Sequence, residues 1–381
     1  MKLQRSPGLP RGFRLDPEYN STPVLLRPLG LLSGAIATQA IATGRARALA
    51  GGPLAFTQIE IFLASDGGEE VEMVMASISE VEEWAVSEGE SVTAAVAAQI
   101  QALSVPRGSF AGLDMNQPRI MGVINVTPDS FYDGGRLSTS DAAVDHGHAL
   151  IAAGADILDI GGESTRPGSD AVTEAAELDR ILPVIDRLAG TGAVISVDTR
   201  RPAVMREACA AGATIINDIC ALTEPGALEA AAETGAAVML MHMQGAPASM
   251  QEAPSYDHAP YETAQFLSRR IKTCEAAGME TSMIAVDPGI GFGKTLAHNL
   301  EILEALPLYH ALGCALALGV SRKSFIGAIT GIDDSDDRLP GTLAAVGHGA
   351  AQGVQIHRVH DVAEAQQAVA VMRAIAESGG K

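Results

Sequence analysis

The sequence predicts an α/β protein in which a (β/α)8 barrel, the TIM-barrel fold, follows a small α+β region. From about Arg119 onward one unit recurs: a short apolar run rich in β-branched residues, a polar loop, and an Ala-, Leu- and Glu-rich segment of helical period. Eight such units fit into roughly 260 residues, the length that a (β/α)8 barrel needs. The runs are apolar along their whole length, which is typical of parallel strands buried on both faces.

Eight apolar runs are the expected barrel strands. Between them, residues 174–190 and 201–212 have the composition and period of helices, and Pro202 suits the first turn of the second helix. The expected strands span residues 119–124, 156–160, 193–197, 213–217, 237–241, 283–286, 315–320 and 354–359.

The part of the chain before the barrel has a different pattern. Residues 1–103 are expected to form a small α+β domain, residues 104–118 a linker, and residues 119–381 the barrel. Within the first part, the pattern predicts a strand over 55–65, a strand or helix over 70–86 and a helix over 91–103. Nothing in it indicates catalysis, which favours a structural or interaction role and leaves open dimer support, stability, regulation or a remnant of another activity.

Composition limits the classes of partner. The chain has 381 residues and a formal net charge of -20, so a nucleic acid or an anionic membrane would be repelled over most of the surface. Its four cysteines include no Cys-x-x-Cys pair, and the sequence has neither a signal peptide nor an apolar stretch of about 18 residues. We therefore expect a cytoplasmic protein with no nucleic-acid or membrane partner, whose anionic ligands are held by local cations.

Residues 286–295, VDPGIGFGKT, look like the phosphate-binding loop of an ATP-binding protein. That loop requires Gly, four residues and then Gly-Lys-Ser/Thr, because backbone N–H groups surround the phosphate. Pro288 stands where the first glycine is required, and proline has no N–H to donate. The sequence therefore excludes the literal motif, and the stretch is expected to begin at the end of the sixth barrel strand.

Polar residues follow every expected strand, and in this fold active sites lie at the carboxyl ends of the strands. A single Asp or Asn after a strand is usually the N-cap of the next helix, but eight polar loops on one rim indicate a site. The loops carry Asn125, GGESTRPGS (161–169), DTR (198–200), Asn217 with Asp218, HMQG (242–245), DPGIGFGK (287–294), SRKS (321–324), and Arg358 with His360.

The rim has both the cations and the hydroxyl groups that a di-anion requires. The loop 161–169 adds the hydroxyls of Ser164 and Thr165 and glycine-flanked amides, donors suited to phosphoryl oxygens, although a plain surface turn would have a similar composition. The cations follow the second, seventh and eighth strands: Arg166, Lys323, Arg358 and His360.

Carboxylate and amide groups on the same rim can recognise a heterocycle. Asp198, Asn217 and Asp287 follow the third, fourth and sixth strands, so they should converge and accept or donate at the N–H edge of a ring. Helix capping with a structural ion pair is the alternative for Asp198 taken alone. A cluster of metal ligands is not indicated, but Asn125 can supply an oxygen to Mg²⁺ bound mainly by phosphates.

The motifs together resemble those of the dihydropteroate synthase family, folate-pathway enzymes that join 7,8-dihydropterin pyrophosphate to p-aminobenzoate. The resemblance covers roughly the last two thirds of the chain. The motifs occur in order along it: MGVINVTPDSFYDGG, GADILDIGGESTRPG, ISVDTR, IINDI, LMHMQG, VDPGIGFGKT, SRKSFIG and RVHDV.

The resemblance implies a role for each matching position. The pterin would be held by Asp198, Asn217, Met241, Asp287, Gly319, Lys323 and Arg358. The pyrophosphate would be held by Asn125, Thr165, Arg358 and His360, with Mg²⁺ on Asn125 as the cofactor. The p-aminobenzoate would be held by Pro128, Phe131, Arg166, Pro167, Phe292, Ser321 and Lys323. The glycines of residues 286–295 would let the backbone approach the flat ring, and Lys294 would have only a structural role.

The resemblance also implies a dissociative reaction in a homodimeric enzyme. Asp198, Asp287, Lys323 and Arg358 would be its catalytic residues. Two alternatives share the pterin slot: a methyltransferase that passes a methyl group from methyltetrahydrofolate to a corrinoid protein, and a barrel that binds pterin without turning it over. The first has no need of STRPG or SRK to hold pyrophosphate and arylamine, and the second does not explain why every matched position is intact.

Overall fold

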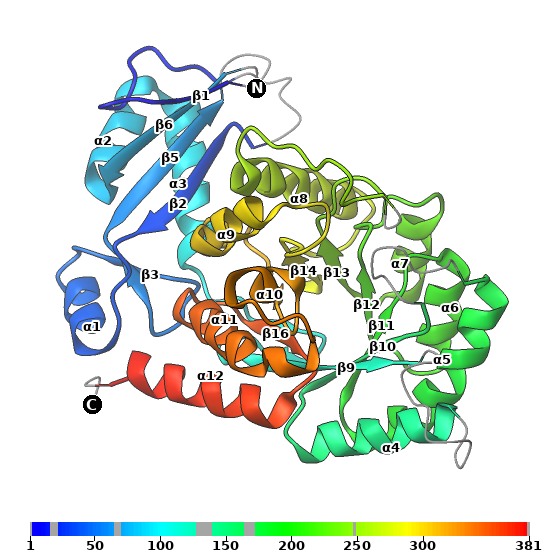
Figure 1. The fold of residues 1–381 in the computed structure, drawn as a ribbon. Coiled ribbons are helices and arrows are strands. Elements are labelled where there is room, and N and C mark those ends of the chain that lie inside the picture. The colour runs from blue at the N-terminus through cyan, green and yellow to red at the C-terminus, as the bar shows by residue number, and fades with distance from the viewer. Residues whose placement is uncertain are drawn as a thin grey trace.

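In the computed structural model, eight parallel strands close into a barrel with helices around it, and a four-stranded sheet lies beside the barrel (Figure 1). The structure describes residues 2–15, 22–64, 70–126, 139–163, 172–246 and 249–378. In these residues no helix is both long and apolar enough to cross a membrane. The predicted fold class, a (β/α)8 barrel with a small α+β region before it, is confirmed.

The barrel strands agree with the predicted runs to within two residues at each end. Neighbouring strands follow the order of the chain, and β16 closes the barrel by pairing with β9. The strands are β9 (Arg119–Asn125), β10 (Ile157–Gly161), β11 (Val194–Asp198), β12 (Ile215–Asp218), β13 (Ala237–Met241), β14 (Ile284–Asp287), β15 (Ala315–Gly319) and β16 (Ile356–Val359).

Helices follow the barrel strands and cover their outer faces (Figure 1). Both predicted helices are present, and Pro202 occupies the first turn of α6. The helices are α4 (Thr139–Ala152), α5 (Glu174–Leu188), α6 (Pro202–Ala210), α7 (Ala227–Thr234), α8 (Ala259–Ala276), α9 (Leu296–Glu304), α10 (Ser324–Thr330), α11 (Leu339–Ala351) and α12 (Val362–Ala376), with short 3-10 helices η2 (Ala189–Thr191), η3 (Thr281–Met283), η4 (Leu306–Leu312) and η5 (Asp336–Arg338).

Alternation along the strands separates two layers of core. On β13, Ala237 and Met239 belong to an apolar cluster inside the barrel, whereas Val238 and Leu240 belong to the cluster under the helices. This is the period of two that a strand imposes on its side chains. Toward the carboxyl ends of the strands the inward positions become polar. The amino-terminal end of the barrel is therefore filled by apolar side chains, and its carboxyl-terminal end carries the polar groups.

The N-terminal region is an α+β unit built on a sheet in the order β1-β6-β5-β2, with α2 and α3 packed on it (Figure 1). The segment 70–86, expected as strand or helix, contains both: strand β6 passes into helix α2 at Ser77, whose side chain and that of Glu80 form a capping box. The elements are β1 (Lys2–Arg5), β2 (Val24–Leu29), α1 (Gly34–Ala42), β3 (Arg47–Ala48), β4 (Ala55–Phe56), β5 (Gln58–Ala64), β6 (Glu70–Ser77), α2 (Ile78–Glu88) and α3 (Glu90–Ser104).

The stretch expected as a linker carries a hairpin of β7 (Ser109–Phe110) and β8 (Leu113–Asp114). Phe110 and Met115 are 1% and 3% exposed and belong to the apolar cluster inside the barrel. The hairpin therefore closes the lower end of the barrel, opposite to the rim on which the polar loops lie.

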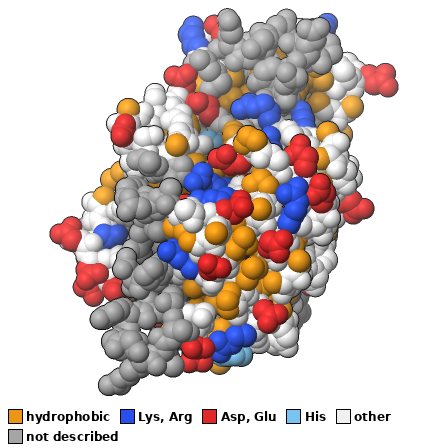
Figure 2. All heavy atoms as spheres, turned by 90° about the vertical axis from the view of Figure 1, so that its right-hand side faces the viewer, with side chains coloured by type: hydrophobic (Ala, Val, Ile, Leu, Met, Phe, Trp, Pro, Cys, Tyr) orange, Lys and Arg blue, Asp and Glu red, His pale blue; other side chains and the backbone are white. Residues whose placement is uncertain are grey.

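The surface on the α5–α7 side has charges of both signs. Figure 2 shows acidic and basic side chains interspersed with apolar ones, without a continuous basic patch among the side chains described on this face.

Candidate active site

Strand register brings the predicted polar residues together at one end of the barrel. Asp198 pairs in register with Gly161 on one side and with Asn217 on the other. Across the barrel, Met241 is level with Asp287, and Gly319 is level with Arg358. Residues that lie far apart in the sequence therefore line a single pocket floor, because parallel strands all end on the same rim.

Asp159 is the central acceptor of this floor. Its carboxylate accepts hydrogen bonds from Ser196 Oγ at 2.7 Å, Asn217 Nδ2 at 3.1 Å and Arg358 Nε at 2.6 Å. The side chain is completely buried, so these donors replace the water that a carboxylate would otherwise need. Asp159 thus fixes the orientation of two of the groups predicted to bind pterin, Asn217 and Arg358.

Arg358 bridges two carboxylates. Its Nη2 donates to Asp198 Oδ2 at 2.9 Å while its Nε donates to Asp159. Burial, followed by the nearby charge of Asp159, raises the pKa of Asp198 to about 7, and Arg358 opposes that shift. Burial alone would lower the pKa of Arg358, but Asp159 and Asp198 raise it, so the guanidinium stays charged. Asp198 is therefore close to the point at which it gains or loses its proton near neutral pH.

Asp287 and Lys323 form the opposite side of the floor. Lys323 Nζ donates to the carbonyl oxygen of Ile290 at 2.5 Å and lies 4.8 Å from the centre of the Phe292 ring. Burial lowers the pKa of Lys323 to about 8 although Asp287 opposes the change, and burial raises the pKa of Asp287. A Cβ atom on Gly319 would lie 3.6 Å from Lys323 Nζ, so glycine leaves open the space between these charges.

The loop 286–295 packs against the loop that follows β13. A Cβ atom on Gly289 would lie 1.9 Å from the carbonyl oxygen of His242, and one on Gly293 would lie 2.2 Å from that of Gln244. These two glycines have φ of +70° and +58°, and they allow the backbone to approach the neighbouring loop closely. The sequence predicted that the glycines would let the backbone approach a flat ring, but at Gly289 and Gly293 the close neighbour is the loop after β13. Lys294 is buried and donates to the carbonyl oxygens of His242 at 3.2 Å and Phe292 at 3.0 Å, which ties the two loops together.

Ser321 and His360 meet at the ends of β15 and β16. Ser321 Oγ lies 2.9 Å from His360 Nδ1 and accepts from the His360 backbone N–H at 3.2 Å. The hydroxyl is engaged with His360 and Ser321 is 7% exposed, so this structure places Ser321 beside the predicted pyrophosphate ligand.

Asn125 lies at the end of β9, half-buried and level with Gly161 of β10. In the described part of the chain, no group of three His, Cys, Asp or Glu side chains could hold a metal ion. One amide oxygen fits Mg²⁺ that takes its remaining ligands from phosphate and water, but it does not fit a metal held by protein alone.

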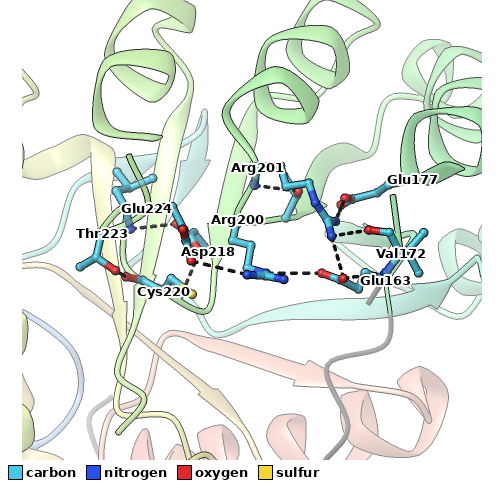
Figure 3. Close-up of polar contacts among 11 residues, drawn as sticks. Glu163, Val172, Glu177, Arg200, Arg201, Asp218, Cys220, Thr223 and Glu224 are labelled. Atoms are coloured by element: carbon cyan, nitrogen blue, oxygen red, sulfur yellow. Dashed lines mark hydrogen bonds and ion pairs between the residues drawn. The ribbon is translucent and has the colours of Figure 1, made fainter. Parts of the chain in front are cut away.

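A cluster of ion pairs lies beside this floor, after β10 and β11 (Figure 3). Arg201 pairs with Glu163 at 2.8 Å and with Glu177, and it also donates to the carbonyl oxygen of Val172. Arg200 lies within 3.4 Å of Glu163 and 3.5 Å of Glu224. Both arginines are thus engaged with carboxylates beside the pocket, whereas Lys323 and Arg358 lie on the pocket floor itself.

The structure brings together the predicted residues that it describes: Asn125, Asp198, Asn217, Met241, Asp287, Phe292, Gly319, Ser321, Lys323, Arg358 and His360. The predicted residues Pro128, Phe131, Thr165, Arg166 and Pro167 lie outside the described residues. Sequence reasoning missed Asp159. The signal was present, because Asp159 is a charged residue in the middle of the apolar run DILDI, and a carboxylate buried in a strand needs partners.

Known proteins are similar to this chain over the barrel. A family model described as pterin-binding enzyme matches residues 121–360. The Escherichia coli (strain K12) dihydropteroate synthase is 49% identical over 263 residues, covering 69% of this chain and 93% of that protein.

Two solved structures extend the comparison. The Xanthomonas albilineans dihydropteroate synthase with 4-aminobenzoic acid has a TM-score of 0.67 and 47% identity, covering 70% of this chain and 96% of that one. The same enzyme in complex with 7,8-dihydropteroate has a TM-score of 0.64 and 45% identity, covering 69% and 95%.

Proposed function

Since the chain belongs to the dihydropteroate synthase family of pterin-binding enzymes, we propose that it condenses 6-hydroxymethyl-7,8-dihydropterin diphosphate with p-aminobenzoate to give 7,8-dihydropteroate and pyrophosphate. The observation that carries the proposal is the buried floor of the barrel, where Asp198 and Asp287 face Lys323 and Arg358 around the space that Gly319 leaves open.

The carboxylates and the amide recognise the pterin. Its amino and ring N–H groups donate to Asp198 and Asp287, and Asn217 supplies both a donor and an acceptor. Asn217 and Asp287 are each 5% exposed and the Asp198 side chain is 11% exposed, so a ligand that does not match these groups would leave them unpaired, at a cost of about 1–3 kcal/mol for each group. Met241, which is 5% exposed at the end of β13, lines the flat face of the ring.

The pyrophosphate lies toward the ends of β9, β15 and β16. His360 and Arg358 donate to its oxygens, and Thr165 of the loop after β10 adds a hydroxyl. Asn125 would hold Mg²⁺, which would supply positive charge to the pyrophosphate oxygens. Ser321 contributes by orienting His360 through the contact between its hydroxyl and Nδ1.

The reaction exchanges one bond for another at the pterin methylene carbon. The carbon–oxygen bond breaks and its electron pair leaves with pyrophosphate; the arylamine nitrogen then forms the new carbon–nitrogen bond and loses one proton. In the dissociative order the carbon is briefly a cation delocalised into the pterin, and Asp198 and Asp287 provide negative potential beside it. No nucleophilic side chain is needed.

The p-aminobenzoate binds above this carbon. Phe292 lies beside Lys323 at the edge of the floor and presents an aromatic surface to the arylamine ring. Pro128, Phe131, Arg166 and Pro167 complete the pocket from the loops after β9 and β10, where they exclude water so that the amine captures the cation.

The N-terminal region has a structural role in this proposal, and the enzyme is a homodimer. The region's contacts with α8, η4 and α9 support the first part, because they hold the sheet against the barrel. Light scattering of the purified chain tests the second part, with a mass of twice 39.3 kDa expected.

One assay tests the function. Purified full-length protein with Mg²⁺ and both substrates should form 7,8-dihydropteroate and pyrophosphate in equal amounts. Omitting p-aminobenzoate and adding labelled pyrophosphate should exchange label into the pterin substrate if the carbon–oxygen bond breaks first. Pterin binding without product would indicate a binding protein, and methyl transfer from methyltetrahydrofolate to a corrinoid protein would indicate the methyltransferase.

A further inference from the structure

The loops after β15 and β16 are joined by two side-chain pairs that continue the register of the strands. Within the strands, Leu318 is level with His357 and Gly319 with Arg358. Counting on by the same offset makes residue 321 level with 360 and residue 322 level with 361. The first of these pairs is Ser321 with His360, at 2.9 Å between Oγ and Nδ1.

The second pair is a bidentate ion pair between Arg322 and Asp361. Arg322 Nε donates to Asp361 Oδ2 at 3.0 Å and its Nη2 donates to Oδ1 at 2.6 Å. Side-chain exposures of 27% and 16% keep the pair partly shielded from solvent. A two-point contact between two planar groups fixes both the distance and the orientation of the loops that carry them.

The backbone around Arg322 is held in an uncommon conformation. Arg322 has a φ of +59°, in the left-handed region that a residue with a Cβ adopts only at some cost. Its N–H donates to Thr342 Oγ1 at 2.9 Å, and its carbonyl oxygen accepts from Arg338 Nη1 at 3.0 Å. The surrounding contacts therefore enforce this turn, with Lys323 and Ser321 on the two sides of it.

Asp361 departs from its local preference in the same way. It occupies the N-cap position of α12, where an aspartate usually accepts from a backbone N–H of the first helical turn, yet it makes no such bond. Its carboxylate is engaged with Arg322 instead. Both partners of this contact thus depart from their local preference, Arg322 in its backbone conformation and Asp361 in its missing cap bond. Such departures are typical of residues with a functional role.

We propose that the Arg322–Asp361 pair is a positioning device for the pyrophosphate end of the site, which rests on the proposed function. It holds the two loops at the separation at which His360, beside Asp361, and Lys323, beside Arg322, face the same ligand. The Arg322 guanidinium is engaged with Asp361 and Asp336, and it therefore acts through His360 and Lys323. Positions 322 and 361 are thereby assigned to recognition of the diphosphate substrate.

The test uses full-length variants. Asp361→Asn and Arg322→Gly should each weaken binding of inorganic pyrophosphate with Mg²⁺, measured by calorimetry, by about tenfold, with a similar rise in KM for the pterin diphosphate. The KM for p-aminobenzoate should rise by a smaller factor, because His360 beside the pair binds only the pterin diphosphate, whereas Lys323 contributes to both substrates. Glycine at position 322 keeps the left-handed backbone without strain, so Arg322→Gly removes the side chain alone.

Matched variants separate the pair from general damage. Asp336→Asn removes the other partner of the same guanidinium, 2.5 Å away and 75% exposed, and should leave both constants within about twofold. Arg322→Lys should fall between the wild type and Arg322→Gly, and the double variant Arg322→Gly with Asp361→Asn should be no worse than either single variant.

The proposal is overturned if Asp361→Asn and Arg322→Gly bind pyrophosphate as the wild type does. It is also overturned if the KM values for both substrates rise together in step with a lower Tm, which would indicate a structural role only. If either variant does not fold, Arg322→Lys against Asp336→Asn gives the same comparison. A wild-type protein that forms no dihydropteroate refutes the proposed function instead, while pyrophosphate binding still tests the pair.

Discussion

Two sets of buried polar groups among the described residues differ in kind, one at the mouth of the barrel and the other at the boundary between the N-terminal sheet and the barrel. At the mouth they are mostly charged: Asp159 and Asp198 share Arg358 across contacts of 2.6 and 2.9 Å. At the boundary several are neutral amides that pair with backbone groups: Gln265 Nε2 donates to the carbonyl oxygen of Thr22 at 2.7 Å, and Gln265 Oε1 accepts from its N–H at 3.1 Å.

The two sets differ in whether their hydrogen-bonding groups and charges are satisfied without a ligand. The Gln265 amide accepts from the one backbone donor of Thr22 and donates to its backbone carbonyl oxygen, so both backbone groups are satisfied without a ligand. At the mouth, burial holds the pKa of Asp198 near 7 and that of Lys323 near 8, far from their ordinary values. Perturbed titratable groups that converge in a pocket indicate function, whereas matched neutral groups indicate adhesion between two parts of a fold.

The largest effect should follow from removing a charged group at the mouth. Asp198→Ala and Lys323→Ala should each lower kcat/KM for dihydropteroate formation by about 10²–10³-fold or more, because each removes a charge that contacts the ligand in a site shielded from water. Steady-state kinetics with the purified variants measures this effect. Glu233→Ala, which breaks an exposed ion pair with Arg206, is the control and should behave as the wild type. Near-normal kcat/KM in both Asp198→Ala and Lys323→Ala would show that these residues do not contribute to the active site.

A smaller effect should follow from changing the group beneath the site. Asp159→Asn keeps the size of the side chain but removes the charge that holds Arg358, so we expect kcat/KM for the pterin diphosphate to fall by about 10–100-fold. Ser196→Ala removes one neutral donor to the same carboxylate and should cost less than about tenfold. A variant at position 159 that is as active as Ser196→Ala would show that Arg358 keeps its place without Asp159.

The pH dependence of pterin binding should follow Asp198. The ionised carboxylate accepts from the pterin N–H groups, so affinity for 6-hydroxymethyl-7,8-dihydropterin should rise by up to about tenfold between pH 6 and pH 7.5. Calorimetry over that range avoids the titration of Lys323 near pH 8. Asp198→Asn should bind weakly at every pH, and a slope that survives in that variant would assign the proton to another group.

The same carboxylate has the opposite effect on folding. The pKa of Asp198 is raised in the folded protein, so its protonated form stabilises the unliganded fold. This contribution is fully present below about pH 4 and is lost as the pH rises through 7.

The strands and their order could be predicted because their signal is local. An apolar run of four to six residues in a repeating unit is visible in the sequence, and β9 to β16 occur where those runs lie. Most of the polar floor followed from the same signal, since Asp198, Asn217 and Asp287 are the last or nearly the last residues of their strands.

What could not be predicted depends on which distant side chains meet. The local pattern predicts only that Asp159 lies in a strand. Its role as an acceptor is not visible locally, because its three donors come from positions 37 to 199 residues away in the chain. The pairing of Arg322 with Asp361 depends on a left-handed backbone conformation at Arg322, and the sequence has no glycine at this position that would have indicated it. The glycines of the loop 286–295 were visible, but the carbonyl groups that they approach lie on another loop.

The smallest effect on activity should come from the boundary itself. Gln265→Leu keeps the volume of a side chain that is 4% exposed but leaves the N–H and carbonyl of Thr22 unpaired. The free energy of unfolding should fall by about 1–3 kcal/mol, measured by urea denaturation, while kcat/KM for both substrates stays within about twofold of the wild type. If Gln265→Leu loses activity without losing stability, the boundary between the N-terminal sheet and the barrel is coupled to the active site. The buried polar groups could then no longer be divided into a functional set and a structural set.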